Sequence, residues 1–416
     1  MDSQLRDLLD AAVGEPPHQV SIGAVRRRVA MRRVMECTAA AAAVAVIAVI
    51  VSAGTGALSH TPRPSSGGSA VVPTIYLSSG GPGIGTVIPI TIAANTPGKP
   101  IKVGRNPGQI AITPDGKTAY VANPGSTTVT PIATTTNTPG KPIKVGRNPA
   151  KFATRGITIG ITPDGKTAYV ANLASDTVIP ITVATNTAGK PIKVGRAPVS
   201  VAITPDGKTV YVSNLNSGTV TPITTATNTP GTPIKVGRGP VGMVITPDGK
   251  TAYVADQNSG TVTPITVATN TPGKPIDVGS VAAGIAITPD GKTVYVVSEG
   301  SGTVTPVTVA TNTAGKPIKV GRSPGQIAIT PDGKTAYVVN RRSGTVTSIV
   351  TATNTAGKPI KIDGIGPAGM AITPDGKTAY VVAMFPGAIT PIATATNTPG
   401  KPINTGARIS AIAITP

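Results

Sequence analysis

The string ThrProAspGlyLysThr occurs seven times in the 416 residues of this chain. The steps between the aspartates of successive copies are 49, 42, 42, 42, 42 and 43 residues. These aspartates are Asp115, Asp164, Asp206, Asp248, Asp290, Asp332 and Asp375. A constant period near 42 residues indicates one supersecondary unit that is stacked many times. The repeat therefore decides the fold class before any other feature does.

A single repeat, residues 106–147, contains four short segments rich in strand-forming residues. They read GlyGlnIleAlaIleThr, ThrAlaTyrValAlaAsn, ThrThrValThrProIle and IleLysValGlyArg. Gly, Pro, Asn and Asp separate them, and AspGly is a strong turn signal because Gly supplies the positive φ of a tight turn. No stretch of the repeat has helical periodicity. Four strands per repeat predict an all-β fold, a β-propeller with four-stranded blades.

The tyrosines give the number of blades, because all eight occupy the same place in the second strand. They are Tyr76, Tyr120, Tyr169, Tyr211, Tyr253, Tyr295, Tyr337 and Tyr380. The chain ends on IleAlaIleThrPro, a first strand with nothing after it. We therefore predict eight blades, with seven as the alternative. One blade should combine the last strand with the three N-terminal strands, which closes the ring and hides its sheet edges.

The repeats resemble the YVTN family of β-propeller proteins over roughly residues 71–416. The resemblance rests on TyrValAlaAsn at 120–123 and 169–172, TyrValSerAsn at 211–214 and TyrValValAsn at 337–340. The copies at 253–256, 295–298 and 380–383 depart from this pattern at the fourth position. The family occurs in bacterial and archaeal surface-layer and secreted proteins, so the resemblance implies the fold and an extracytoplasmic place. It implies little chemistry, because the family is functionally mixed.

The segment before the repeats has a different composition. Residues 37–58 carry no charge, and 22 such residues are long enough to cross a bilayer of about 30 Å as a helix. An arginine cluster precedes the segment at Arg26, Arg27, Arg28, Arg32 and Arg33. The positive-inside rule then predicts a cytoplasmic tail at 1–36 and a single-pass cell-membrane protein with an extracytoplasmic propeller. The alternative is a cleaved signal peptide and a secreted protein, since ValSerAla at 51–53 has the small-x-small pattern of a processing site.

The remaining boundaries follow from composition. Residues 59–72, with Pro62, Pro64 and neighbouring Ser and Gly, predict a flexible linker, and the propeller is expected over 73–416. The single Cys37 lies at the start of the apolar segment and has no second cysteine to pair with.

The sequence offers little for catalysis. The only histidines, His18 and His60, precede the propeller, so a histidine metal site or a Ser-His-Asp triad in the ring is excluded. Seven of the twelve acids after residue 36 are the turn aspartates, whose role is structural. We predict no cofactor, no metal site and no catalytic residue. A lactonase-like or dehydrogenase-like propeller enzyme is one alternative, and a structural surface-layer component is another.

The net charge of +20 comes almost entirely from the repeats, in recurring GlyLysProIleLysValGlyArg segments. The loop into each next blade should lie on the same face as the loop between the second and third strands, where the repeats differ most. Arginines at this place are expected to form a ligand-binding ring near the channel mouth: Arg105, Arg147, Arg196, Arg238, Arg322 and, one residue off, Arg408. Ser280 and the AspGlyIleGly loop at 363–366 interrupt the ring.

The hypothesis is a binding scaffold for an anionic cell-envelope polymer or a protein partner. Alternatively, these cations only keep a surface poor in aromatics soluble. Nucleic acid is not expected as a partner, because no aromatic residues are interleaved for base stacking.

Overall fold

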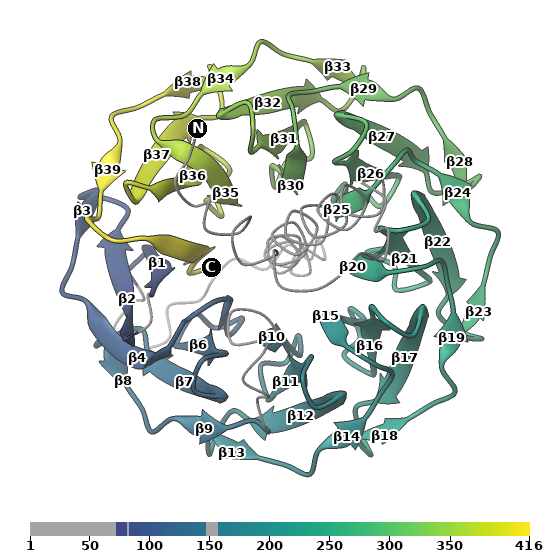
Figure 1. Ribbon diagram of the computed structural model, residues 1–416, viewed down its shortest axis with the longest axis horizontal. Coiled ribbons are helices and arrows are strands. Elements are labelled where there is room, and N and C mark those ends of the chain that lie inside the picture. The colour runs from purple at the N-terminus through teal and green to yellow at the C-terminus, as the bar shows by residue number, and fades with distance from the viewer. Residues whose placement is uncertain (1–71, 81–82, 147–156) are drawn as a thin grey trace, which may run out of the picture. The chain divides into compact units, whose positions relative to one another are not determined.

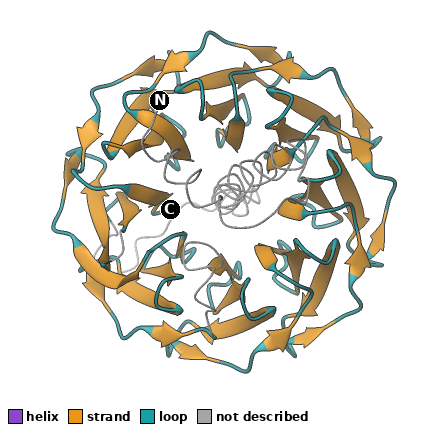
Figure 2. Cartoon of the chain, in the orientation of Figure 1, coloured by secondary structure: helices purple, strands orange, loops and turns teal. Residues whose placement is uncertain are grey.

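Each repeat folds into one blade, and the blades stand side by side around a ring (Figure 1). The computed structural model describes residues 72–80, 83–146 and 157–416. These ranges contain strands and connecting loops but no helix, and so no helix there that could span a membrane (Figure 2). The predicted tail at 1–36, the predicted membrane segment at 37–58 and the linker up to residue 71 lie outside the described residues.

The innermost strands are β5 (Ile110–Ile112), β10 (Ile157–Ile161), β15 (Pro198–Ile203), β20 (Pro240–Ile245), β25 (Ala282–Ile287), β30 (Pro324–Ile329), β35 (Ile365–Ile372) and β40 (Ile409–Ile414). The second strands, which carry the tyrosines, are β1 (Thr74–Ser79), β6 (Thr118–Asn123), β11 (Thr167–Asn172), β16 (Thr209–Asn214), β21 (Thr251–Asp256), β26 (Thr293–Ser298), β31 (Thr335–Asn340) and β36 (Thr378–Phe385). The third strands are β2 (Ile84–Thr91), β7 (Thr128–Ala133), β12 (Thr177–Thr182), β17 (Thr219–Thr224), β22 (Thr261–Thr266), β27 (Thr303–Thr308), β32 (Thr345–Val350) and β37 (Ala388–Ala393).

The outermost strand of every blade is divided into two pieces. The first pieces are β3 (Thr96–Pro97), β8 (Thr138–Pro139), β13 (Thr187–Ala188), β18 (Thr229–Pro230), β23 (Thr271–Pro272), β28 (Thr313–Ala314), β33 (Thr355–Ala356) and β38 (Thr398–Pro399). The second pieces are β4 (Ile101–Arg105), β9 (Ile143–Lys144), β14 (Ile192–Lys193), β19 (Ile234–Lys235), β24 (Ile276–Asp277), β29 (Ile318–Lys319), β34 (Ile360–Lys361) and β39 (Ile403–Asn404). Both pieces pair with opposite ends of the third strand.

The predicted fourth strand, IleLysValGlyArg, was therefore wrong in its extent. Only β4 runs through all five residues, and elsewhere the strand stops after two, an Ile and the residue that follows it. The GlyLysPro segment interrupts the pairing because proline has no N–H to donate to a ladder. The ValGlyArg that follows is instead free to form the loop into the next blade.

We number the blades 1 to 8 in chain order. Blade 1 comprises β40 and β1–β4, and blades 2 to 8 comprise β5–β9 through β35–β39. Strand β40 pairs antiparallel with β1, and Figure 1 shows this yellow C-terminal strand beside purple β1. Thr74 N donates to Thr415 Oγ1 at 2.9 Å, and Thr415 N donates to Thr74 O at 3.0 Å. The predictions of eight blades and of a composite closing blade are confirmed.

The tyrosines join each blade to the next, which explains why they recur. Each Tyr hydroxyl donates to the side-chain oxygen of an asparagine in the loop between the third and outer strands of the following blade, over 2.6–3.0 Å. The pairs are Tyr76–Asn137, Tyr120–Asn186, Tyr169–Asn228, Tyr211–Asn270, Tyr253–Asn312, Tyr295–Asn354, Tyr337–Asn397 and Tyr380–Asn95. The last pair spans the closure between blades 8 and 1, so these Tyr–Asn bonds run around the complete ring.

The backbone conformation of the asparagine and the protonation of the tyrosine hydroxyl both favour the Tyr–Asn hydrogen bond. Asn270 has φ +55°, a left-handed conformation that asparagine tolerates better than most residues. Burial raises the pKa of Tyr211 to about 12, so its hydroxyl stays protonated and remains a donor. Around the tyrosines the core is made of Val, Ile and Ala, and the four central residues of β16 are fully buried. Every blade packs against a neighbour on both of its sides, and this burial of Val, Ile and Ala stabilises a core that has few aromatic residues.

Candidate binding face

The loops of the propeller lie on two faces with different sequences. The loop from the third to the outer strand meets the AspGly turn of its own blade, as where Thr225 Oγ1 donates to Gly207 O at 2.8 Å. We call this the turn face. The loop between blades meets the loop between the second and third strands of the next blade, as where Asn216 N donates to Arg196 O at 3.2 Å. We call this the variable face. The contact confirms the prediction that the loop between blades and the loop between the second and third strands lie on the same face.

On the turn face, the repeated aspartates act as turn formers. Asp206 Oδ1 accepts the Thr204 hydroxyl at 2.6 Å and the backbone N–H of Lys208 at 3.0 Å. The Thr204 hydroxyl, followed by the Lys208 N–H, lowers the pKa of Asp206. The Lys208 ammonium lies 4.0 Å from the same carboxylate, and both side chains are largely exposed, so this ion pair contributes little. The structural role predicted for these aspartates is confirmed.

On the variable face, the LysValGlyArg segment is fixed from two sides. A Cβ at Gly195 would lie 2.7 Å from Asn214 Cγ, so only glycine lets the loop lie against this buried amide. From the other side, Arg196 N donates to Ser217 Oγ at 2.6 Å. The next residue, Ala197, has φ +55°. The loop backbone is therefore fixed, and the Arg196 side chain is left exposed to solvent.

The structure places five of the six predicted arginines in exposed positions on this face, four at equivalent places and Arg408 one residue further along its loop. They are Arg105, Arg196, Arg238, Arg322 and Arg408. Three of them repeat the bond of Arg196 closely, with Arg N–H to Ser Oγ distances of 3.2, 2.7 and 2.6 Å at Arg105, Arg238 and Arg322. None of the five forms an ion pair with a carboxylate of the described residues. Arg147 lies outside the described residues, as does the seven-residue insertion near Lys151, Phe152 and Arg155 that lengthens the step from Asp115 to Asp164 to 49 residues.

Two junctions between blades carry no arginine. Between blades 5 and 6 the segment reads AspValGlySer, and Ser280 keeps the same backbone bond, its N–H donating to Ser301 Oγ at 3.0 Å. Between blades 7 and 8 it reads LysIleAspGly. Each of these junctions instead exposes an aspartate, Asp277 and Asp363 respectively. The charge of the variable face is thus unevenly distributed around the ring.

Blades 6 and 7 contribute an oppositely charged pair from their variable loops. Ser323 Oγ donates to Glu299 Oε1 at 2.6 Å. Burial lowers the pKa of Arg341, and attraction to Glu299 opposes this effect. A Cβ at Gly325, in the innermost strand of blade 7, would lie 2.9 Å from Arg341 Nε. Sequence reasoning missed this pair, because its members are 42 residues apart and belong to loops with unrelated sequences.

The neutral polar residues of the innermost strands do not gather into a site. Gln326 Nε2 donates to Met370 O at 2.9 Å, and Met370 N donates to Gln326 Oε1 at 2.6 Å. Gln109 bonds to the backbone of Ile159 in the same way, with distances of 3.3 and 2.8 Å. Each carboxamide thus hydrogen-bonds to the backbone of the next blade's innermost strand. Its polar atoms serve the packing of the blades. Ser410 is exposed.

Blade 8 is longer than the others on the variable face. Its strands β35 and β36 have eight residues each, and their register runs out to Ile365 opposite Phe385. Phe385 is 52% exposed, and the Arg408 guanidinium lies 5.5 Å from the centre of its ring. This cation–π contact holds Arg408 although its loop, ThrGlyAlaArg, differs from the LysValGlyArg pattern.

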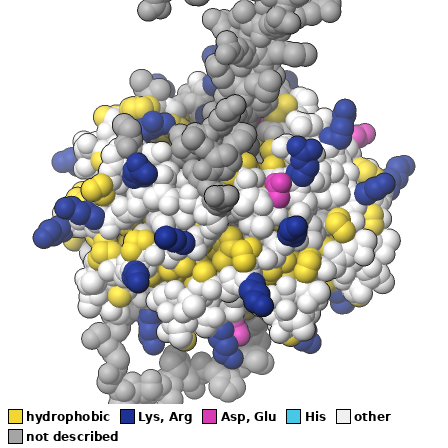
Figure 3. All heavy atoms as spheres, turned by 60° about the horizontal axis from the view of Figure 1, so that its bottom comes forward, with side chains coloured by type: hydrophobic (Ala, Val, Ile, Leu, Met, Phe, Trp, Pro, Cys, Tyr) yellow, Lys and Arg dark blue, Asp and Glu magenta, His cyan; other side chains and the backbone are white. Residues whose placement is uncertain are grey.

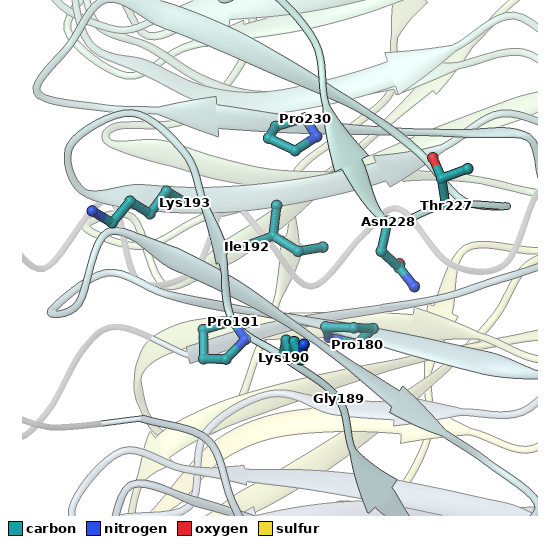
Figure 4. Close-up of a pocket in the computed structure, with 9 residues that line it drawn as sticks. All are labelled: Pro180, Gly189, Lys190, Pro191, Ile192, Lys193, Thr227, Asn228 and Pro230. Atoms are coloured by element: carbon teal, nitrogen blue, oxygen red, sulfur yellow. The ribbon is translucent and has the colours of Figure 1, made fainter.

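The outer rim has a hydrophobic band between scattered lysines and arginines (Figure 3). One cavity of about 460 Å³ lies here between blades 3 and 4, lined by Pro180, Gly189, Lys190, Pro191, Ile192, Lys193, Thr227, Asn228 and Pro230 (Figure 4). Pro191 and Pro230 belong to the divided outer strands, where they limit pairing with another chain, and Pro180 lies in the third strand β12. Within the described residues, no three His, Cys, Asp or Glu side chains come together to hold a metal ion.

Comparison with known proteins assigns the fold to a family. A family described as lactonase, 7-bladed β-propeller, matches residues 96–232 and 265–363, which is more than half of the chain. The chain belongs to this lactonase propeller family. It has eight blades where the family description gives seven. No curated protein matches the chain.

Solved structures show the same architecture. Hydrazine synthase from Kuenenia stuttgartiensis is 25% identical with a TM-score of 0.57, covering 70% of this chain and 96% of that one. The dihydro-heme d1 dehydrogenase NirN is 13% identical with a TM-score of 0.69, covering 85% of this chain and 77% of that one. A protein of unknown function from Desulfotomaculum acetoxidans is 16% identical with a TM-score of 0.55, covering 82% and 98%. The two less identical structures support the propeller fold alone.

Proposed function

We propose that this propeller is a binding scaffold whose variable face engages an anionic polymer of the cell envelope. The observation that carries the proposal is a set of five exposed arginines on one face, four of them at equivalent positions, with no ion pair to a described carboxylate. The backbone of four of them is fixed by a hydrogen bond to a serine, so the points from which these side chains extend are set before a ligand arrives. The turn face differs, because its lysines each lie near the aspartate of their own turn.

The path of the chain suits a tether at the opposite side. Strand β1 begins at Thr74, where second strands leave the turn face, so the chain enters the propeller there. A preceding membrane anchor would hold the domain by its turn face. The variable face would then be accessible to a polymer of the envelope. The anchor and this location belong to the proposal.

The expected energetics fit a polymer better than a small anion. A single exposed charge contact contributes about 0–1 kcal/mol, which is too little for useful affinity. A polymer that meets several arginines at once gains from each, because later contacts form within the same complex. The repeat thus converts weak contacts into measurable binding.

The proposal is tested with the purified full-length chain and linear poly(glycerol phosphate) as the probe. Binding is measured by calorimetry at low and at high sodium chloride concentration. We expect the logarithm of the association constant to fall with the logarithm of the salt concentration, as in other polyanion complexes. No binding, or binding that is indifferent to salt, would refute the proposal.

A lactonase-like hydrolase is the second candidate, and the family match favours it. On the variable face, Glu299 and Arg341 are the oppositely charged residues that such chemistry would use, one to activate water and one to polarise a carbonyl. The full-length chain is assayed against a panel of aliphatic and sugar lactones. Hydrolysis above the buffer rate that disappears in Glu299→Gln would replace the binding proposal.

A further inference from the structure

The blades repeat regularly around the ring, but the charged residues of the variable face do not. From blade 8 through blade 1 to blade 5, every junction that the structure describes exposes an arginine: Arg408, Arg105, Arg196 and Arg238. We call these four the arginine arc. From blade 5 back to blade 8, two of the three junctions expose an aspartate and no arginine. Arg322 is the exception, and an aspartate-bearing junction lies on either side of it.

The other acids outside the turns follow the same division. Asp256 lies in blade 5 and is buried, and Glu299 lies in blade 6. The arc side holds one such acid, Asp176, and its carboxylate accepts the backbone N–H of Ala197 at 2.7 Å. The lysines three residues before the arginines divide less sharply: Lys102, Lys193 and Lys235 lie on the arc side, and Lys319 and Lys361 keep this place on the other side, where only Asp277 replaces it. Arg342, in the variable loop of blade 7, is a further exposed cation on that side. The division therefore rests on the two exposed aspartates and the missing arginines.

Resting on the proposed function, we infer that the ligand is a linear polyanion that follows the arginine arc and leaves the junctions between blades 5 and 8 uncovered. A small anion would meet one junction and gain one weak contact. A ligand covering the whole ring would approach Asp277 and Asp363, and like charges at short range oppose it. A chain of phosphates can instead contact the four arginines of the arc and end where an exposed aspartate takes the place of an arginine.

The chain provides a matched pair of residues for the test. Arg196 and Arg322 both end a LysValGlyArg segment, both are exposed, and both donate their backbone N–H to a serine Oγ at 2.6 Å. They differ in the charge of the neighbouring junctions. Binding of inorganic polyphosphate to the full-length chain is compared for Arg196→Ala and Arg322→Ala, with orthophosphate as the monomeric control.

We expect Arg196→Ala to weaken polyphosphate binding about two- to five-fold, the range of one exposed charge contact. Arg322→Ala should leave the affinity within error. The triple variant Arg105→Ala, Arg196→Ala and Arg238→Ala should lose at least about ten-fold and reduce the salt slope by about three, one for each phosphate contact. Orthophosphate should bind weakly to all variants.

A gain of affinity provides a test that misfolding cannot mimic. Asp277→Lys with Ser280→Arg restores LysValGlyArg at the junction of blades 5 and 6, on a backbone that already makes the serine bond. This variant should bind polyphosphate more tightly, and in it Arg322→Ala should become costly. The inference is overturned if Arg322→Ala weakens the natural chain as much as Arg196→Ala, or if the restored junction has no effect. Absence of any salt-sensitive binding by the natural chain would instead refute the proposed function itself.

Discussion

At the scale of single residues, Asp256 shows the effect of replacing the amide nitrogen of an asparagine by a carboxylate oxygen. It ends the second strand of blade 5, where blades 4 and 7 have Asn214 and Asn340. Asn214 donates from Nδ2 to two threonine hydroxyls, at 3.2 and 2.9 Å. At Asp256 the equivalent threonines, Thr261 and Thr263, donate to the carboxylate at 3.3 and 2.6 Å. The threonines reverse their direction, so the geometry is kept and the charge is added.

The carboxylate of Asp256 is fully buried, and its burial raises its pKa to about 6, against the opposing effect of the Thr263 hydroxyl. A folded-state pKa above the ordinary value of 3.8 means that ionisation weakens the folded state. This cost is absent below about pH 4, develops as the pH rises through the folded pKa, and is complete above it.

We therefore predict that Asp256→Asn stabilises the protein at neutral pH by about 1–3 kcal/mol, since one unit of pKa corresponds to about 1.4 kcal/mol. The gain should shrink as the pH is lowered from 7 to 4. Denaturant unfolding at several pH values measures it. Asn214→Asp is the reciprocal control and should destabilise the protein at pH 7. A gain that is independent of pH would contradict the role given to the buried charge.

At the scale of the elements, the blade is more predictable than its contacts with neighbours. The three inner strands follow from the β-forming segments and from the AspGly turn between the first two. The divided outer strand does not, because whether a proline interrupts pairing depends on which third-strand groups face it. The Tyr–Asn bonds also escape sequence reasoning, since Tyr211 and Asn270 are 59 residues apart.

The Tyr–Asn bond gives a prediction for the contact between blades 4 and 5. Tyr211→Phe removes the hydroxyl and leaves the Asn270 carbonyl without this donor, which should cost about 1 kcal/mol of unfolding free energy. Asn270→Gly is the partner change, because glycine accepts φ +55° without strain. The double variant should cost clearly less than the sum of the two single changes in denaturant unfolding. Additive costs would mean that the bond contributes nothing.

At the scale of the whole molecule, stability depends on the closing blade. Strand β40 covers the edge of β1 and completes the contacts of blade 1 with blade 8. Each innermost strand contacts the next around the ring, and β40 lies between β35 and β5. A propeller without β40 would have an open edge with unpaired N–H and C=O groups.

We predict that deletion of residues 409–416 lowers the thermal midpoint and makes the protein self-associate through β1. Differential scanning calorimetry and light scattering measure the two effects. Ser410→Ala, at an exposed position of the same strand, is the control and should change neither property. A truncated chain that stays monomeric with an unchanged midpoint would show that the ring does not need its closing strand.

The sequence by itself determined the repeat, the four segments of each blade and the count of eight, because a period of 42 residues and eight equivalent tyrosines leave few other architectures. It also placed the arginines on one face, since strand order in a meander decides which loops share a side. Only the tertiary structure decided which residues of distant repeats meet: Tyr211 with Asn270, Glu299 with Ser323, and Arg408 with Phe385. Local periodicity cannot specify such contacts, because they depend on the stacking of neighbouring blades and on loops where the repeats differ.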